Sequence, residues 1–280
     1  MYTKADKISK LAHLFLVACI YKSLSPKYSW GNSISKGKIQ NDKIKLPSLP
    51  DNSPDFAFME SFIAELEAER VAELEAYLKA AGLDNYELTE EEKGALDNLK
   101  NIKWKEFKIT GILSIKNTFN ILSRDIVANS GKTPYLCASS QNNAVSSYIS
   151  FNKNFIEKGD CIFIGGKTFT VTYQEKDFYS NDSHNLVLYP IDKKLSKSEY
   201  LYLITCIYKS LSPKYSWGNS ISKAKIQNDT FVLPSKNGSP DFETMETLIS
   251  AVQKSVIEDV VKYKDKKIAA AKEVTEKDFG

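Results

Sequence analysis

The sequence predicts an α+β fold, with one mixed α/β domain and two long helices that pair as an antiparallel coiled coil. Three observations predict it. One segment occurs twice, each copy leads into a long stretch of helical periodicity, and short strand-like runs lie between these stretches. A chain of 280 residues can form one large domain or two ordinary ones with their own hydrophobic cores.

The repeated segment covers residues 20–42 and 207–229. Within it the two copies differ only at Gly37, which is Ala224 in the second copy. Each copy continues through Leu-Pro-Ser to Ser-Pro-Asp-Phe and then into a long helical pattern. Because this spacing is far too long for a solenoid, the pattern indicates the closing segment and exit helix of one kind of domain, used twice.

These features divide the chain into four segments. Residues 1–50 contain the first copy without the residues that precede the second, so they are predicted to be the C-terminal piece of a domain. Residues 53–101 are predicted to hold the first long helix, followed by a short helix and a linker. Residues 102–235 are predicted to form one compact α+β domain, and residues 239–274 the second long helix.

The helices have recognisable ends. Ser53 is a suitable N-cap, Pro54 suits the first helical position, and Gly82 is a natural stop. Thr89 and Glu92 form a capping-box pattern that predicts a shorter helix near 90–101. We expect the two long helices to pair within one chain, with a helix of another chain as the second choice. The apolar faces are Met59, Phe62, Ile63, Leu66, Leu74 and Leu78 in the first, and Met245, Ile249, Val252, Val256, Val260 and Tyr263 in the second.

Between the long helices the periodicity changes. Strand-like runs occupy residues 148–151, 160–164, 168–173 and 185–189, separated by clusters of Gly, Asn, Asp and Ser. Lys197 to Lys209 is predicted to be a helix that leads into the second copy.

The composition argues against several classes of site. The four cysteines form no Cys-x-x-Cys and the chain has two histidines, so we expect no metal site. The apolar run at residues 11–20 is too short to span a membrane, and its second copy lies in mid-chain. We therefore expect both runs to be core segments, with no membrane contact and a cytoplasmic protein.

The net charge of +3 is unevenly distributed. Residues 1–50 and 102–235 each carry a net charge of +7, residues 51–101 carry −10, and residues 236–280 carry −1. Alternating basic and acidic blocks suit a protein that touches a polyanion with some faces and protein with others. Solvated surface charge explains any single block equally well.

Four groups of residues follow one another in an order that is typical of a known family. They are Trp104, Phe107 and Ile109; Pro134-Tyr135, Ser139 to Asn143 and Val145; Gly159-Asp160, Gly166, Tyr173 and Phe178; and Lys214 to Gly218, Leu233-Pro234 and Gly238 to Glu246. With the duplication, this order resembles the DNA-specificity (S) subunits of type I restriction–modification systems and the related recognition subunits of type IIB-like enzymes. The resemblance covers almost all of the chain.

The resemblance implies a target recognition domain at 102–235 and a non-catalytic, cofactor-free subunit. Such subunits alternate two recognition domains with two long helices, and each domain reads one half of a split site in double-stranded DNA. They give sequence specificity to methyltransferase (M) subunits, and a restriction (R) subunit can join. This chain departs from that plan, because it has both helices but only the last part of a first recognition domain. It therefore resembles a truncated S subunit, or a half-subunit that pairs as a homodimer or with a second S fragment.

Two further function hypotheses remain beside this one. The chain could occupy the methyltransferase without reading DNA productively, and so act as a decoy or regulator. It could also be an enzyme acting alone, but no catalytic set can be assembled around His13 or His184. The Gly-Lys-Thr triplets at Gly131 and Gly166 lack the earlier glycine of a phosphate-binding loop, so no catalytic residue is expected.

One Asn-rich stretch is the first candidate for reading bases. Asn and Gln side chains can bond N6 and N7 of adenine together. The alternative is an ordinary Asn/Ser turn between strands. The residues are Ser139, Ser140, Gln141, Asn142 and Asn143, with Lys167, Tyr173, Gln174 and Lys176 as weaker candidates.

The repeated segment supplies the other DNA-binding candidates. It mixes cations, aromatic rings and an amide, which suits contact with phosphates and bases. Because the same segment would occur in two domains that read different sequences, we favour a role in the fold and in phosphate positioning over direct base reading. The residues are Lys214, Tyr215, Trp217, Asn219, Lys223 and Lys225, with counterparts Lys27, Tyr28, Trp30, Asn32, Lys36 and Lys38.

Overall fold

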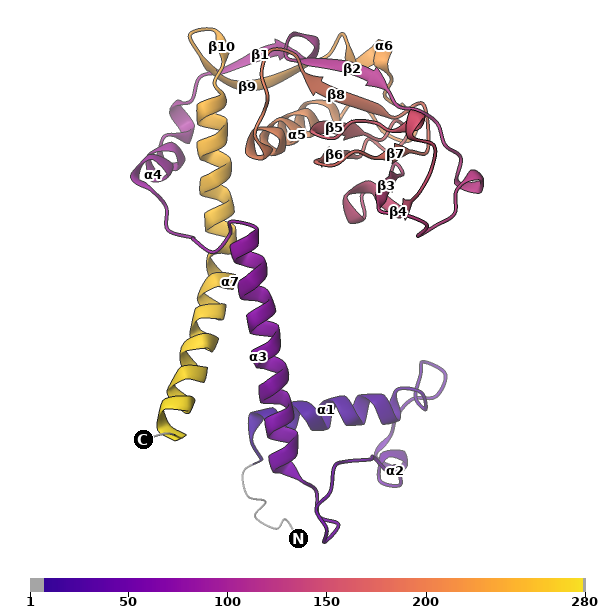
Figure 1. The fold of residues 1–280 in the computed structure, drawn as a ribbon, viewed down its shortest axis with the longest axis vertical. Coiled ribbons are helices and arrows are strands. Elements are labelled where there is room, and N and C mark those ends of the chain that lie inside the picture. The colour runs from indigo at the N-terminus through magenta and orange to yellow at the C-terminus, as the bar shows by residue number, and fades with distance from the viewer. Residues whose placement is uncertain (1–7, 279–280) are drawn as a thin grey trace. The chain divides into compact units, whose positions relative to one another are not determined.

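The computed structural model describes residues 8–278, with side chains as far as residue 270, and the chain divides into two compact units (Figure 1). Unit 1 consists of residues 1–86 and 257–280, and unit 2 of residues 87–256. The C-terminal helix α7 (Phe242–Asp278) contributes its first part to unit 2 and its last part to unit 1. Residues 1–7 of the predicted N-terminal piece lie outside the described residues.

The described strands all lie in unit 2 and form three sheets. The strand orders are β1-β9-β10, β2-β8-β5-β6 and β4-β3-β7. Neighbouring strands are antiparallel, except that β3 and β7 are parallel. The strands are β1 (Trp104–Lys108), β2 (Leu113–Asn117), β3 (Thr133–Leu136), β4 (Val145–Ile149), β5 (Cys161–Ile164), β6 (Val171–Gln174), β7 (Tyr179–Ser180), β8 (Leu186–Pro190), β9 (Thr230–Lys236) and β10 (Ser239–Pro240).

The helices of unit 2 begin where the sequence offers caps. The hydroxyl of Ser196 accepts from the Glu199 backbone N–H at 3.2 Å, and the Glu199 carboxylate accepts from the Ser196 N–H at 2.7 Å, which completes a capping box. The helices are α4 (Glu90–Asp97), α5 (Lys197–Leu211) and α6 (Lys223–Ile226), and the 3-10 turns are η1 (Leu99–Asn101), η2 (Ile109–Gly111), η3 (Ser123–Asp125), η4 (Asn142–Ala144) and η5 (Lys153–Phe155). The predicted helix over 197–209 is confirmed, and the four predicted strand-like runs overlap β4, β5, β6 and β8.

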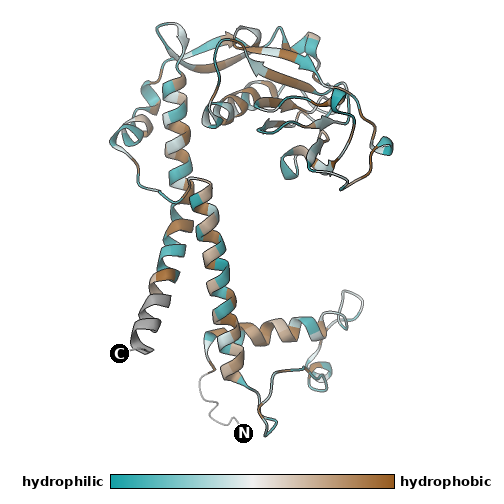
Figure 2. Ribbon diagram, in the orientation of Figure 1, coloured by the Kyte–Doolittle hydropathy of each residue, from teal (hydrophilic) through white to brown (hydrophobic). Residues whose placement is uncertain are grey.

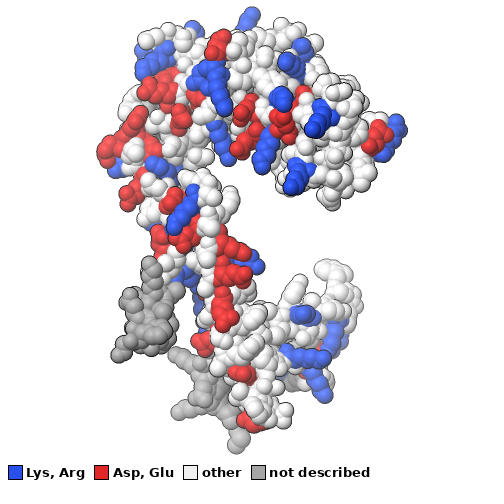
Figure 3. Space-filling view, viewed as in Figure 1, with Lys and Arg blue, Asp and Glu red and all other residues white. Residues whose placement is uncertain are grey.

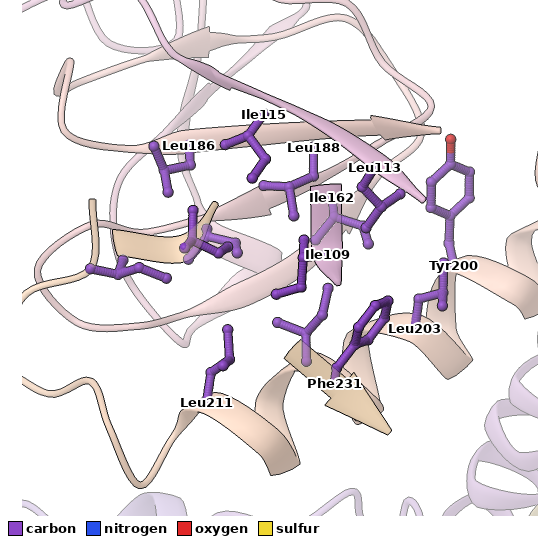
Figure 4. Close-up of a cluster of buried hydrophobic side chains, with 14 of the residues drawn as sticks. Ile109, Leu113, Ile115, Ile162, Leu186, Leu188, Tyr200, Leu203, Leu211 and Phe231 are labelled. Carbon is purple, nitrogen blue, oxygen red and sulfur yellow. The ribbon is translucent and has the colours of Figure 1, made fainter. Parts of the chain in front are cut away.

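The second copy of the repeat forms part of the main core of unit 2 (Figure 4). Ile207 and Leu211 of α5 are fully buried there with Ile162 of β5. Ile226 of α6 lies in the same cluster as Leu188 of β8. Removing each such side chain from water contributes about 1.5–3 kcal/mol, so the second copy is integral to this domain.

Strands β1 and β9 lie near the two ends of the domain in the sequence and pair with each other in the structure. Trp104 is the register partner of Pro234, and Lys108 is the partner of Thr230. β9 therefore contains the Leu-Pro-Ser of the second copy, held between β1 and β10. The strand begins immediately after Asp229, the last residue of the repeated segment.

Helix α4 is fastened to α7 inside unit 2 by one buried carboxylate. Glu92 completes the predicted capping box with Thr89. Its oxygens also accept from Ser250 Oγ at 2.5 Å and from Lys254 Nζ at 2.8 Å. Burial acts to raise the pKa of Glu92, but the bonds from Lys254, Ser250 and the Thr89 N–H outweigh it and hold the pKa at about 2.

Unit 1 is helical. Ser9 caps α1 (Lys10–Leu24) and Ser35 caps α2 (Lys36–Ile39). Phe15 of α1 packs edge-on against Phe62 of α3 (Phe56–Ala80), with ring centroids 5.6 Å apart. Figure 2 shows hydrophobic residues along much of α1 and α3.

The N-cap prediction for the long helices was wrong by two residues. Asp55, not Ser53, accepts from the Phe58 N–H, and α3 starts at Phe56. Asp241 does the same for Thr244 at the start of α7. A carboxylate accepts this bond as well as a hydroxyl does and also meets the positive end of the helix. The predicted stop at Gly82 is confirmed, since this glycine has a φ of +65° just after α3.

In unit 1, α3 and the last part of α7 run in opposite directions (Figure 1). Lys267 Nζ lies 2.6 Å from Glu67 Oε2, and Lys262 Nζ lies above the Tyr86 ring. Coiled-coil pairing stays a prediction.

The apolar face predicted for α7 is correct only at the start of the helix, where Met245 is buried and Ile249 is half-buried. Beyond it Val252, Val256, Val260 and Tyr263 are exposed, whereas Leu248, Ala251, Val261 and Lys264 are buried. Spacings of three and four fit two adjacent stripes on a helix. The buried stripe contains a lysine, which an apolar pattern does not reveal. Among the helices within residues 8–278, none combines the length and apolar character needed to cross a membrane.

Candidate nucleic-acid interface

The Asn-rich stretch links β3 to β4 and is held in a left-handed backbone conformation. Asn142, Asn143 and Ala144 have φ values of 48°, 51° and 67°. Asn tolerates this region better than most residues, because its short polar side chain bonds locally. The amide of Asn142 donates to the Val145 carbonyl, and that of Asn143 donates to the Tyr173 carbonyl, both at 3.0 Å. The turn that was the alternative for this stretch is therefore confirmed, and base reading by it stays a prediction.

The neighbouring candidate Gln174 stabilises this loop through hydrogen bonds. Its side chain is buried and donates to the Asn143 carbonyl at 3.0 Å and to Thr172 Oγ1 at 2.9 Å. Ser139 Oγ accepts from the Gln141 N–H at 3.2 Å. Ser140 and Gln141 are exposed, and their side chains make no hydrogen bond within the described residues. These two side chains are the ones free to meet a base edge.

Two further turns adjoin this loop, and we call residues 138–143, 165–168 and 182–185 the loop cluster. Thr168 Oγ1 donates to the Ala138 carbonyl at 2.9 Å. The Gly166 N–H donates to the buried Asn185 side chain at 3.0 Å. A Cβ at Gly166 would lie 2.3 Å from the His184 carbonyl oxygen, so only glycine fits. The second Gly-Lys-Thr triplet is thus a tight packing turn.

Lys167 in this cluster is paired to an acid that the sequence did not single out. Its Nζ lies 3.2 Å from Asp182 Oδ2, and His184 Nδ1 lies 2.7 Å from Asp182 Oδ1. Burial acts to raise the pKa of Asp182, but the His184 hydrogen bonds and the Lys167 charge outweigh it and lower the pKa. Lys167 therefore approaches any phosphate with its charge partly compensated.

Tyr173 has its ring and its hydroxyl engaged locally. Its ring stacks on Tyr200 of α5 at 4.8 Å, and its OH donates to Asp160 Oδ1 at 2.9 Å. Burial, followed by Asp160, raises its pKa. This geometry fits a packing residue better than a base-stacking one.

Most candidates in the second copy belong to one hydrogen-bonded turn around Asp229. Its carboxylate lies 3.0 Å from Lys214 Nζ and accepts from Tyr215 OH at 2.6 Å. Asn219 donates to the Lys214 carbonyl and accepts from Lys225 Nζ, both at 2.7 Å. These four candidates hold the turn together. Asp229 was not among the predicted site residues, although its occurrence in both copies, as Asp42 in the first, indicated that it has a role.

Two candidates of the second copy remain free. Trp217 at the tip of the turn is exposed, and so is Lys223 at the start of α6. Figure 3 shows Lys and Arg interspersed with Asp and Glu over the face of unit 2 that it presents. Contact with phosphate would therefore depend on individual cations that carry no compensating charge. Lys132, Lys153, Lys176 and Lys223 are exposed and make no ion pair within the described residues.

No cofactor chemistry is suggested by this geometry. Within the described part of the chain, no three His, Cys, Asp or Glu side chains gather where a metal ion could bind. The site consists of polar loops on a closed α+β domain, which continues directly into a long helix. That is the architecture of a recognition domain carried by a helical spacer.

The comparison with protein families identifies this class. The model of the type I restriction modification DNA specificity domain matches residues 2–76 and 101–262. The match covers most of the chain, so the chain belongs to this family of DNA specificity proteins, as its motifs predicted.

Individual relatives agree with the family. The chain is 22% identical over 252 residues to the specificity subunit S.BcgI of a type II restriction enzyme from Heyndrickxia coagulans, and it covers 68% of that protein. It shares its fold with the S subunit of a type I restriction–modification system from M. genitalium, with a TM-score of 0.54 and 12% identity over 94% of this chain and 71% of that one. The HsdS subunit from Thermoanaerobacter tengcongensis matches with a TM-score of 0.41 and 15% identity, over 90% of this chain and 64% of that one.

Proposed function

We propose that unit 2 reads one half of a double-stranded DNA target and confers this specificity on methyltransferase (M) subunits, without catalysing a reaction itself. An R subunit would join the assembly through the M subunits, in the cytoplasm. The observation that supports the proposal most is that the family match spans residues 101–262, which include the whole closed domain and the start of α7.

Within unit 2, the free polar side chains divide into two roles. Gln141, with Ser140 beside it, is placed to bond base edges, because its own loop leaves its amide unused. Lys223 and Trp217 are placed to contact the sugar–phosphate backbone, which positions a protein without reading sequence. Among the other predicted residues of unit 2, Lys176 is a further exposed cation, and the rest bond or pack within the turns that carry these side chains.

The test is reconstitution of the chain with the M subunit of its own restriction–modification system. The complex is used to select its target from random duplexes, and affinity and methylation are then measured on that target. Gln141→Ala is expected to cost about 1–3 kcal/mol on the selected target and almost nothing on unrelated DNA. Gln253→Ala, a half-exposed glutamine of α7, is the matched control and is expected to leave both affinities unchanged.

Lys223→Ala is expected to weaken binding to every duplex alike and to lower the slope of log affinity against log salt by about one. Weak and salt-insensitive binding to all DNA by the complete complex would contradict the proposal. Formation of the complex without any methylation would instead identify a decoy.

A further inference from the structure

A long surface connection joins β2 to β3 and contains only one short turn, η3. It consists of residues 118–132, which we call the β2–β3 loop. The loop runs along the outside of unit 2 (Figure 1). Loops of this length on a compact domain are usually either functional or disordered. The contacts at its two ends decide between these possibilities.

The start of the β2–β3 loop is fixed by hydrogen bonds. Thr118 Oγ1 donates to the Asp182 carbonyl at 2.7 Å, and the Ile121 N–H donates to the Ser180 carbonyl at 3.0 Å. The hydroxyl of the buried Tyr135 donates to the Ile121 carbonyl at 2.7 Å. Since Asp182 belongs to the loop cluster, the β2–β3 loop leaves the domain beside that candidate surface.

The end of the β2–β3 loop is fixed as well. Ser130 Oγ accepts from the Ser150 N–H at 3.0 Å. A Cβ at Gly131 would lie 2.4 Å from the Ile149 carbonyl oxygen, so the loop returns to β4 at a point where only glycine fits. With both ends anchored, the middle of the loop is held out to solvent in a defined place.

The middle of the loop carries Arg124, the only arginine of unit 2. All but two of the 38 Lys and Arg residues of the chain are lysines. The other arginine, Arg70 of unit 1, lies 2.7 Å from Glu73. Lysine is thus the ordinary surface cation of this chain, and the arginine in the β2–β3 loop requires a reason specific to a guanidinium.

The chain itself does not use the guanidinium of Arg124. A guanidinium differs from an ammonium because its planar fork of donors can bond two acceptors at once or stack on an aromatic ring. Within the described residues, Arg124 makes no hydrogen bond and lies over no ring. Its Nε lies 3.8 Å from Asp125 Oδ1, which is too far for a hydrogen bond, and its side chain is 81% exposed. The fork is therefore open to a partner outside the chain.

Guanine is the partner on duplex DNA that fits this fork. Its O6 and N7 lie side by side in the major groove, and arginine bonds them together in the commonest specific contact. A phosphate fits less well, because the neighbouring Asp125 offsets part of the attraction to the DNA backbone. Val127 is 72% exposed close by in the loop, and an apolar side chain suits a base edge such as the thymine methyl rather than a phosphate.

We propose that Arg124 is a specificity-determining residue, which reads one guanine of the DNA target through two parallel hydrogen bonds. The β2–β3 loop is then a second reading loop beside the one that carries Gln141, and the two loops read different bases. The proposal rests on the proposed DNA reading by unit 2 and deepens it by naming a base that the target contains.

Base analogues test the contact in the complete complex. The chain, reconstituted with the M subunit of its own system, selects its target from random duplexes. Each guanine of that target is then replaced in turn by 7-deazaguanine, which lacks the N7 acceptor. The unaltered complex is expected to lose affinity about five- to tenfold at one guanine, because one of two bonds disappears. Arg124→Ala should bind the selected target about 10- to 100-fold more weakly and show no further loss with the analogue at that guanine.

Two further variants separate base reading from charge. Arg124→Lys keeps the charge without the planar fork, so it should retain affinity for unrelated DNA and lose most of the preference for that guanine. Lys132→Ala removes an exposed cation at the end of the same loop and is the matched control. It should weaken binding to all duplexes alike and leave the response to 7-deazaguanine intact. Because Arg124 is largely exposed, all these variants should fold, and unchanged urea midpoints check this.

Three results would overturn the inference. One is the same response to 7-deazaguanine at every position with and without Arg124→Ala. Another is an equal loss for Arg124→Ala on the selected target and on unrelated DNA, which would make Arg124 a phosphate contact. The third is a selected target without guanine on either strand. In all three the complex still selects a target, so the proposed function would stand. A complex that selects no target would contradict the proposed function and this inference with it.

Discussion

Truncating one isoleucine to alanine measures how much the second copy contributes to unit 2, and the first copy supplies the control. Ile226 is fully buried in the main core, so Ile226→Ala removes packed carbons and leaves a cavity. Such truncations cost about 2–5 kcal/mol in a close-packed core. Ile39 occupies the same place in a helical turn that differs only by Gly37 in place of Ala224, but it is 43% exposed, so Ile39→Ala is expected to cost about 1 kcal/mol or less.

Urea denaturation followed by the fluorescence of Trp104, in a chain whose Trp30 and Trp217 are replaced by Phe, is the appropriate assay. Trp104 lies on β1, which pairs with β9, and it therefore reports on the closure of unit 2. Because the two units can unfold separately, a global probe would mix their transitions. With a slope of about 2 kcal/mol per molar urea, Ile226→Ala should lower the midpoint by about 1–2.5 M and Ile39→Ala by less than about 0.5 M.

Equal shifts for the two variants would refute the reasoning. They would mean that the first copy is as buried in the isolated chain as the second. The measurement is made at low protein concentration, where a second chain cannot cover Ile39. A small shift for both variants would instead contradict the role of the second copy as core.

The remaining predictions concern two buried carboxylates. Glu92→Gln is expected to lower the stability of unit 2 by about 1–3 kcal/mol at pH 7, because the lowered pKa of Glu92 means that its charged form is the bonded one. That difference should be complete above the unfolded pKa near 4.5, shrink as the pH falls, and vanish near pH 2; urea midpoints of both proteins at several pH values check it. Asp229→Asn is expected to cost about 1–3 kcal/mol by leaving Tyr215 and Lys214 poorly paired, whereas Asp42→Asn in the more exposed copy should cost less. Equal urea midpoints for these two variants would show that packing against residues 104–195 adds no stability to the turn around Asp229.

The sequence predicted the parts of the fold that follow from local rules. The capping box of Thr89 and Glu92, the stop at Gly82 and the helix at 197–209 each depend on residues close in the chain. The sequence did not predict the long-range contacts of the same residues. The sequence does not indicate that Glu92 also meets Ser250 and Lys254, more than 150 residues away.

The candidate site shows the same limit. Asn142 and Asn143 have the right chemistry to read adenine, but their left-handed backbone turns both amides toward carbonyls of the protein. Gln141 has the same amide and no such bond within the described residues. Only the backbone conformation separates these three neighbours.

The pairing of β1 with β9 has a consequence for how the domain can change. Trp104 and Pro234 are neighbours across a sheet, so the polypeptide enters and leaves the domain at almost the same point. Everything between these strands can be replaced by another sequence whose two ends pair in the same way, and the flanking segments then keep their starting positions. A new binding preference can therefore arrive as one interchangeable cassette rather than through many separate substitutions.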